Sequence, residues 1–212
     1  LYPVQLPSGI GLEASGIIEE VGDDVKLFKV GDRVSRASAP IGAYSEKQIV
    51  PENKLVLVPD GVSNEVASCI TLKGITAEYL LHRAYPLKKG NKILYHAAAG
   101  GLGQILCAWA NSMGAEVIGT VGSKEKEAIA KKNGCHHVIN YTDKNFVEEV
   151  EKIVGKNGID VVYDGVGLTT FEGSIEVLKI RGMMVAFGNA SGYVDTIDVK
   201  KHINAKGLFF TR

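Results

Sequence analysis

Short apolar runs alternate with helix-like patterns from Asn91 to the end of the chain. The apolar runs predict buried strands over residues 93–95, 116–121, 137–141, 159–164, 183–188 and 208–211. Between them, apolar residues at helical spacing predict helices over residues 105–113, 123–133, 146–154 and 170–178. Such alternation predicts an α/β fold in which a doubly wound parallel sheet carries helices on both faces.

The segment before this region has a different pattern, typical of β structure. Strands are predicted over residues 16–22, 30–34, 43–50 and 55–58. A helix is predicted to begin at the N-cap Ser63, to continue to Leu81, and to break near Lys73 and Gly74. The predicted domains are therefore residues 1–73, a partial β domain with a linker helix, and residues 74–212, a dinucleotide-binding domain. Four short strands leave open edges, so we expect further chain before Leu1.

A glycine-rich turn joins the predicted strand 93–95 to the helix that follows it. Ala98, Gly100 and Gly103 stand at the three small positions of the pattern G-x-G-x-x-G, with Gly101 and Leu102 inside it. Gly100 would allow a pyrophosphate to approach the helix N-terminus, and Gly103 would allow close packing of helix on strand. An ordinary turn would also explain the glycines, but the order strand, turn, helix, strand favours a nucleotide site.

Three further turns follow predicted strands in the same way. They are Gly122–Ser123, Gly165–Gly167 and Phe187–Asn189. In a parallel sheet the carboxyl ends of the strands meet at one edge, and ligands bind where the strand order reverses. The four turns therefore predict a site across that edge, between the first and fourth strands.

The end of the second strand predicts NADPH rather than NADH. An NAD site has an acidic residue there, about 20 residues after the glycine turn, to accept the ribose hydroxyls. This chain has Gly122 instead, which leaves room for a 2′-phosphate, followed by Ser123 as a donor and Lys126 as a positive charge. The alternative for Lys124 and Lys126 is a solvated helix face.

Composition excludes several classes of protein. Lys and Arg number 24, as do Asp and Glu, so the formal net charge is zero and a nucleic acid is disfavoured as the main partner. The three cysteines are far apart and odd in number, which favours a reducing, cytoplasmic compartment over a disulfide framework. No apolar run approaches the ~20 residues of a membrane span, so no membrane partner is expected.

Several of these motifs together resemble one known family. They are residues 6–14, 30–34, 42–45, 96–103, 119–122, 140–141, 162–164 and 187–189. With them the chain resembles, over essentially its whole length, the NADPH-dependent quinone oxidoreductases of bacterial type, in the zeta-crystallin-like branch of the medium-chain dehydrogenase/reductase superfamily. The resemblance implies a Rossmann domain after part of a GroES-like catalytic domain, a homodimer, and a whole protein that is longer at both ends.

The resemblance also implies a set of residues that contact NADPH. Carried over position by position, they are Tyr79, Gly101, Leu102, Gly122, Ser123, Lys126, Tyr141, Val166, Phe187, Gly188 and Asn189. For Tyr79 and Tyr141 ordinary packing stays an alternative, and Asn189 is also a common turn residue.

The implied reaction is hydride transfer from NADPH to a quinone. No catalytic residue is assigned, because the sequence suggests no Ser/His/Asp arrangement and no paired carboxylates with a catalytic role. Tyr44 is the one phenol of the first segment that could line the pocket, but it is expected to be a packed strand residue. A zinc site is not expected, because Leu12 stands where zinc enzymes of the superfamily have a histidine before Glu13, and the cysteines lack ligand spacing. Reduction of an enone or alkenal, or non-catalytic NADPH binding by a crystallin-like protein, stays open.

Overall fold

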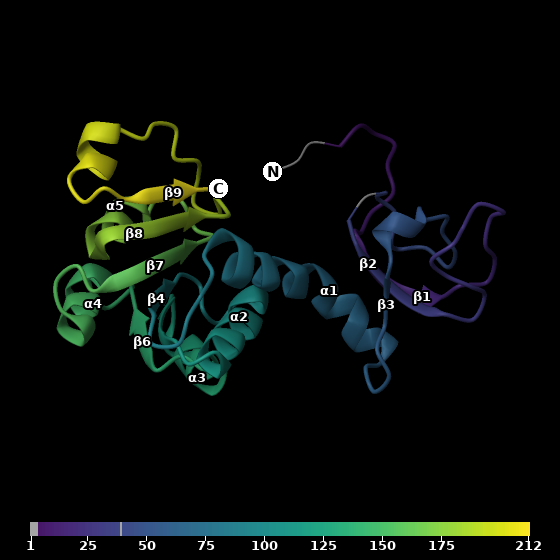
Figure 1. Ribbon diagram of the computed structural model, residues 1–212, viewed down its shortest axis with the longest axis horizontal. Helices are drawn as coiled ribbons and strands as arrows, with labels where there is room; N and C mark the ends of the chain where they lie inside the picture. Colours follow the sequence, from purple (N-terminus) through teal and green to yellow (C-terminus); the bar gives the residue numbers. More distant parts are fainter. Residues whose placement is uncertain (1–3, 39) are drawn as a thin grey trace. The chain divides into compact units, whose positions relative to one another are not determined.

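The chain forms two compact units in the computed structural model, which describes residues 4–38 and 40–212. The first unit extends to Ile75, and the second comprises Thr76–Arg212 (Figure 1). The division lies within helix α1 (Asn64–Glu78), close to the predicted domain boundary between residues 73 and 74.

The first unit contains a three-stranded antiparallel sheet in the order β1-β2-β3. Its strands are β1 (Glu13–Ile17), β2 (Arg33–Ala37) and β3 (Val56–Leu57), with a short 3-10 helix, Glu52–Lys54, before β3. The strand at 55–58 was predicted nearly correctly. The strands predicted over 16–22 and 30–34 are shifted, because the β1–β2 ladder ends at Ile17 and Arg33, before a turn that brings Gly31, at φ 91°, back to Ile18.

The strand predicted over residues 43–50 is wrong. The segment makes no ladder, and its start is held to the 10–11 region by single backbone bonds, Ala43 N to Gly11 O and Tyr44 N to Ile10 O. Tyr44, expected to be packed in a strand, is 77% exposed. The apolar residues of this segment, Ile49 above all at 94% exposure, have no core in the described chain to pack against.

Helix α1 begins as predicted and ends differently. The Ser63 hydroxyl accepts a hydrogen bond from Val66 N at 3.3 Å, which confirms the N-cap. The predicted break near Lys73 and Gly74 is wrong, because a single glycine costs a helix only about 1 kcal/mol and does not stop it. After α1 the chain continues as a π-helix, Tyr79–Ala84.

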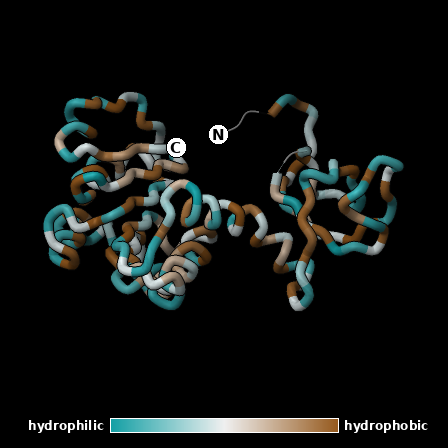
Figure 2. The backbone as a smooth tube through the Cα atoms, in the orientation of Figure 1, coloured by the Kyte–Doolittle hydropathy of each residue, from teal (hydrophilic) through white to brown (hydrophobic). Residues whose placement is uncertain are grey.

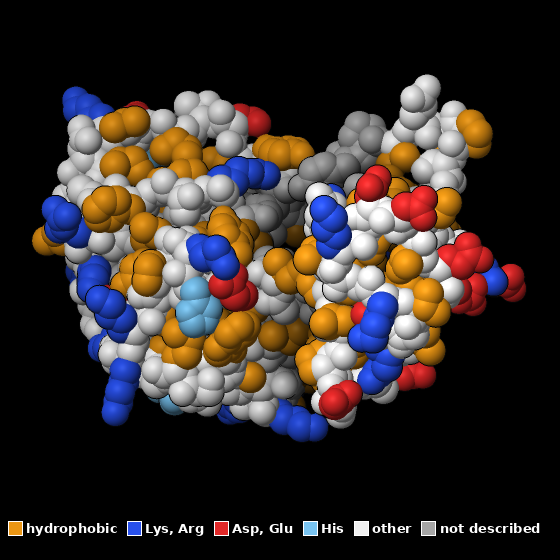
Figure 3. Space-filling model, turned by 45° about the vertical axis from the view of Figure 1, so that its right-hand side comes forward, with side chains coloured by type: hydrophobic (Ala, Val, Ile, Leu, Met, Phe, Trp, Pro, Cys, Tyr) orange, Lys and Arg blue, Asp and Glu red, His pale blue; other side chains and the backbone are white. Residues whose placement is uncertain are grey.

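Hydrophobic side chains are widely exposed in the first unit. Hydrophobic residues recur along α1 (Figure 2), and among them Val66 and Ile75 are 48% and 53% exposed. Orange side chains lie between charged ones over the visible surface of this unit (Figure 3). Leu27 of this unit is 64% exposed. The described part of the unit therefore buries little of its apolar surface.

The second unit is built on a six-stranded, wholly parallel sheet, as predicted, and the strand order is β6-β5-β4-β7-β8-β9. The strands are β4 (Lys92–Tyr95), β5 (Glu116–Val121), β6 (His137–Asn140), β7 (Ile159–Asp164), β8 (Leu178–Ala186) and β9 (Phe209–Thr211). The helices are α2 (Gly101–Ser112), α3 (Lys124–Lys132), α4 (Phe146–Val154), α5 (Phe171–Val177) and a π-helix, Val199–Asn204. The order reverses between β4 and β7, the predicted switch point.

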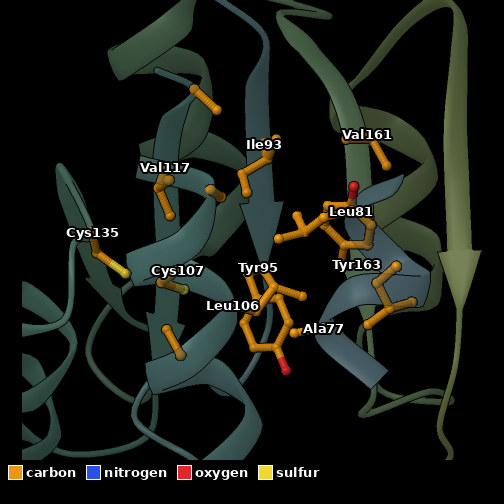
Figure 4. Packing of buried hydrophobic residues seen from close by; sticks show 14 of the residues in the cluster. Ala77, Leu81, Ile93, Tyr95, Leu106, Cys107, Val117, Cys135, Val161 and Tyr163 are labelled. Atoms are coloured by element: carbon orange, nitrogen blue, oxygen red, sulfur yellow. The ribbon is translucent and has the colours of Figure 1, made fainter. Parts of the chain in front are cut away.

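Successive side chains of the central strands point to opposite faces of the sheet, so the core consists of two clusters, one on each face. Ile93 and Tyr95 of β4 pack with α2, α3 and the π-helix Tyr79–Ala84, whereas Leu94 packs with α4 and α5. Figure 4 shows part of the first cluster, where strand and helix side chains meet, among them Ile93, Tyr95, Val117, Val161, Tyr163, Leu81, Leu106 and Cys107. The sheet is therefore covered on both faces, as a parallel sheet requires.

Strand β8 is longer than predicted and begins earlier. The predicted helix ended at residue 178 and the predicted strand began at residue 183, but Leu178 already pairs with Ile159. The ladder shifts register between Ile159 and Val161, and Arg181 takes a φ of 60°. A β-bulge therefore accommodates Arg181 and Gly182, which are typical of a turn, without ending the strand. In the described residues no helix is long and apolar enough to cross a lipid bilayer.

Candidate dinucleotide-binding site

The carboxyl edge of the parallel sheet carries all four predicted turns. The glycine turn follows β4, Gly122–Ser123 follows β5, Gly165–Gly167 follows β7, and Phe187–Asn189 follows β8. Tyr141, which directly follows β6, lies on the same edge. Tyr79 comes from another element, the π-helix before β4, and is partly buried against the same core cluster as Leu102 and Phe187.

The glycine turn brings helix α2 very close to strand β4. Gly100 is the N-cap of α2, and the turn contains Ala97 at a φ of 61°. A Cβ added at Gly103 would lie 2.6 Å from the carbonyl oxygen of Ala98 and 2.8 Å from that of Ala97. Only glycine allows this approach of α2 to β4. The first N–H groups of a helix have no acceptor within the helix, so those at the start of α2 are candidates to bind an anion.

Alanine is tolerated at the first small position because the neighbouring strand has a glycine beside it. A Cβ added at Gly119 of β5 would lie 2.6 Å from the Ala98 methyl and 2.7 Å from the Cys135 sulfur. The methyl group and the sulfur therefore fill the space that Gly119 leaves. The departure from the three-glycine pattern is compensated within the sheet.

Gly122 leaves less room than predicted. A Cβ at this position would lie 2.5 Å from the hydroxyl oxygen of Tyr141, so the tyrosine occupies the space directly over the glycine. Tyr141 is nevertheless 51% exposed. Glycine is therefore needed at position 122 to make room for the Tyr141 phenol. The Tyr141 hydroxyl lies at the end of β5, where the 2′-phosphate is predicted.

Helix α3 begins beside this pair. Its N-cap is Ser123, and a hydrogen bond from the Ser123 hydroxyl lowers the pKa of the Glu125 carboxyl in the first turn. Lys126 is exposed and forms no ion pair with any residue in 4–38 or 40–212. A free helix N-terminus, a hydroxyl and an uncommitted lysine are the groups that suit a phosphate.

The turns after β7 and β8 are bonded to one another. Val166 O accepts from Ser191 N at 2.8 Å, and Gly165 O accepts from Ala190 N at 3.3 Å. The Phe187 ring lies over Gly165, where an added Cβ would be 2.8 Å from it. This ring also stacks on Tyr95, with centroids 6.0 Å apart.

A buried chain of polar side chains runs beneath this edge, and the sequence analysis assigned it no role. His96 Nδ1 lies 2.9 Å from Thr120 Oγ1, and His96 Nε2 lies 2.9 Å from Ser174 Oγ. Asp164 Oδ2 accepts from Thr170 Oγ1 at 2.7 Å and from Ser174 at 3.4 Å. The sequence suggested no Ser/His/Asp arrangement with a catalytic role, and this network was not predicted in any other role. All three residues are at most 1% exposed, so the serine is not a nucleophile open to substrate.

The hydrogen bonds fix the tautomer of His96. Ser174 has a single proton, and both the Thr170 carbonyl, at 2.8 Å, and the Asp164 carboxylate can only accept it. Ser174 therefore accepts from Nε2–H of His96, and Nδ1 accepts from the Thr120 hydroxyl. Burial lowers the pKa of His96, and the Asp164 carboxylate offsets part of that shift. The imidazole is neutral.

This neutrality predicts a pH dependence of stability. Because the folded pKa of His96 is lowered, the unfolded chain binds more protons below the ordinary histidine pKa of about 6.5. The free energy of unfolding should decrease as the pH falls from about 7 to 5, by about 1.4 kcal/mol for each pH unit in which only the unfolded chain takes up the proton.

Denaturant unfolding at several pH values measures this slope. We expect His96→Gln to make the slope shallower. His82→Gln, at an exposed position, should leave it unchanged. An unaltered slope in His96→Gln would show that His96 does not titrate on unfolding.

The position that carries a metal ligand pair in zinc enzymes holds a different arrangement. Glu13, preceded by Leu12, accepts from Leu72 N at 2.8 Å and pairs with Lys73 Nζ at 3.2 Å. Both of its oxygens are engaged by α1. Within residues 4–38 and 40–212 no group of three or more His, Cys, Asp or Glu side chains could hold a metal ion. This donor set does not fit a zinc ion.

Comparison with known proteins identifies two family profiles in the chain. The zinc-binding dehydrogenase profile matches residues 101–211, and the alcohol dehydrogenase GroES-like domain profile matches residues 2–60. The chain is 46% identical over 209 residues to the 2-haloacrylate reductase of a Burkholderia species, covering 97% of this chain and 63% of that protein. It is 45% identical over 213 residues to a quinone oxidoreductase of Pseudomonas aeruginosa, covering 100% of this chain and 66% of that protein.

Solved structures give the same picture. Escherichia coli quinone oxidoreductase complexed with NADPH superposes with a TM-score of 0.93 at 45% identity, covering 100% of this chain and 65% of that one. The chain thus spans 63% to 66% of the length of these relatives.

Proposed function

The chain belongs to the zinc-binding dehydrogenase family of the medium-chain dehydrogenase/reductase superfamily, and from this membership we propose that the protein is an NADPH-dependent quinone oxidoreductase that works without zinc. The observation that carries the proposal is the edge of the six-stranded sheet, where four glycine-bearing turns meet. The identity to quinone oxidoreductases supports the choice of substrate class.

NADPH is the cofactor that this edge fits. The first N–H groups of α2, which follow the N-cap Gly100, suit a pyrophosphate, and Gly103 lets α2 begin close to β4, since a Cβ there would meet backbone oxygens. Ser123, Lys126 and the Tyr141 hydroxyl surround the end of β5, where a 2′-phosphate would lie. Val166, Phe187, Gly188 and Asn189 line the other half of the edge. The relative solved with NADPH supports the same assignment.

The residues of this chain are proposed to position and shield rather than to react. NADPH, when bound, supplies the hydride, and the quinone takes the one further proton of the hydroquinone from water. The stacked rings of Phe187 and Tyr95 form a rigid apolar wall beside the switch point, suited to keeping water from a nicotinamide. No catalytic side chain is proposed.

NADPH oxidation followed at its absorbance maximum tests the function. We expect 1,4-benzoquinone to start turnover by the whole protein. A second candidate, reduction of activated double bonds, is favoured by the 46% identity to 2-haloacrylate reductase, so 2-chloroacrylate and an enone are assayed in parallel. Faster turnover of either than of the quinone would favour the second candidate. Cofactor binding without turnover of any acceptor would indicate a crystallin-like binding protein.

Zinc independence gives a prediction of its own. Because Glu13 is engaged by Lys73 and no ligand cluster occurs in the described part of the chain, quinone reduction should be unchanged after exhaustive treatment with a chelator. Elemental analysis should find no stoichiometric zinc. Loss of activity together with about one zinc per chain, restored on adding zinc, would refute the metal-free mechanism.

Family resemblance extends the proposal to assembly and location. We propose a homodimer in the cytoplasm. The free state of Cys69, Cys107 and Cys135 supports a reducing compartment. Light scattering on the whole protein tests the assembly, and a monomer would contradict it.

A further inference from the structure

The carboxylate of Asp164 lies at the centre of one half of the sheet edge. Its Oδ1 accepts from Val166 N at 2.7 Å and from Gly167 N at 3.0 Å. Its main-chain oxygen accepts from Phe187 N at 2.9 Å. One fully buried residue thus holds the turn after β7 and is bonded to the turn after β8.

No cation balances this buried carboxylate among the described residues. Two backbone N–H groups and the Thr170 hydroxyl donate to it, and the Ser174 hydroxyl, whose single proton is shared with the Thr170 carbonyl, lies 3.4 Å from Oδ2. Burying a charge in this way is costly, and a well-packed apolar residue would be cheaper for stability alone. A fully satisfied buried polar network instead specifies one arrangement of the groups above it.

We infer that Asp164 is a positioning residue for the nicotinamide half of the cofactor, acting through the Gly165–Gly167 turn, an inference that rests on the proposed function. In a doubly wound sheet the glycine turn and the second strand serve the adenosine half, so the turns after β7 and β8 face the other mononucleotide. Asp164 holds these turns in the binding conformation before the cofactor arrives. Such preorganisation raises affinity without direct contact.

The same strand supplies a matched control. Asp160 lies at the amino end of β7, is 8% exposed, and accepts from Lys92 N at 2.6 Å while pairing with Lys179. It is a second buried, hydrogen-bonded carboxylate of β7, on the edge away from the turns. Replacing it should test the effect of a lost carboxylate on the sheet without disturbing the site.

The experiment measures dissociation constants of the whole protein for NADPH, which spans both halves, and for 2′,5′-ADP, which contains only the adenosine half. Asp164→Ala should weaken NADPH binding roughly 10- to 100-fold and change 2′,5′-ADP binding by less than about twofold. Asp164→Asn, which keeps an oxygen for the two N–H groups, should restore most of the affinity. Asp160→Ala should change neither constant.

Thr170→Val provides a second route if Asp164→Ala does not fold. It removes one donor to the carboxylate and keeps the shape, so NADPH binding should weaken in the same selective way, by about three- to tenfold. Equal losses for the two probes, or losses matched by Asp160→Ala, would overturn the inference. Failure of the unsubstituted protein to bind either probe would contradict the proposed function instead.

Discussion

Replacing Lys126 by alanine is expected to weaken NADPH binding roughly 10- to 100-fold and to leave NADH binding almost unchanged. Lys126 lies in the first turn of α3, exposed and without an ion pair in the described part of the chain. Its ammonium is therefore uncommitted, and a 2′-phosphate at the end of β5 would be its partner. NADH has no such phosphate, so the loss should be selective.

Lys124 makes a matched control for this prediction. It is also exposed on the same helix, but it lies two residues earlier and therefore points in a different direction around the helix axis. Lys124→Ala removes the same charge and should change NADPH binding by less than about threefold. Fluorescence titrations of both variants with both cofactors, at one ionic strength, measure the effect. Similar losses of NADPH affinity in the two variants would indicate a long-range electrostatic effect of positive charge rather than a contact between Lys126 and the 2′-phosphate.

Replacing Gly103 by alanine is expected to destabilise the second unit by about 1–3 kcal/mol and to weaken cofactor binding with it. The added methyl would meet the carbonyl oxygens of Ala97 and Ala98, which belong to the backbone of the glycine turn. A side chain could rotate away, but these oxygens move only if the turn or α2 moves. The N–H groups at the start of α2, which are proposed to bind the pyrophosphate, would move with them.

Gly74→Ala is the control for this prediction. Gly74 lies inside α1, and a Cβ there would meet nothing within 4 Å. The same substitution should therefore stabilise the chain slightly, by up to about 1 kcal/mol, through helix propensity. Denaturant unfolding of both variants measures whether each substitution raises or lowers the free energy of unfolding. A Gly103→Ala protein as stable as the original would mean that the close approach of α2 to β4 is not required.

The second unit was predictable because local pattern and tertiary environment agree there. Strands buried on both faces read as continuous apolar runs, and β4, β5, β7 and β8 are each followed by a turn that contains glycine. Right-handed crossovers between neighbouring parallel strands then restrict the possible strand orders. In the observed order β4 lies beside β7. The first unit was less predictable, since the apolar residues of its short strands find few partners among the described residues, and the segment around Ile49 forms loops.

The polar network escaped prediction for a different reason. His96 and Asp164 both stand in motifs that the sequence analysis used, but their partner Ser174 lies 78 residues after His96. Nothing in local spacing brings such residues together, and only the packing of α5 on the sheet does so. The contact between Tyr141 and Gly122 is of the same kind, because it joins the ends of adjacent strands.

A crystal structure of the whole protein with NADPH would test the central claim most directly. The account predicts the pyrophosphate at Gly100–Gly103, the 2′-phosphate within reach of Ser123 and Lys126, and the nicotinamide beside Val166 and Phe187. Density for the cofactor away from the carboxyl edge of the sheet, or a 2′-phosphate with no contact to Ser123, Lys126 or Tyr141, would contradict it.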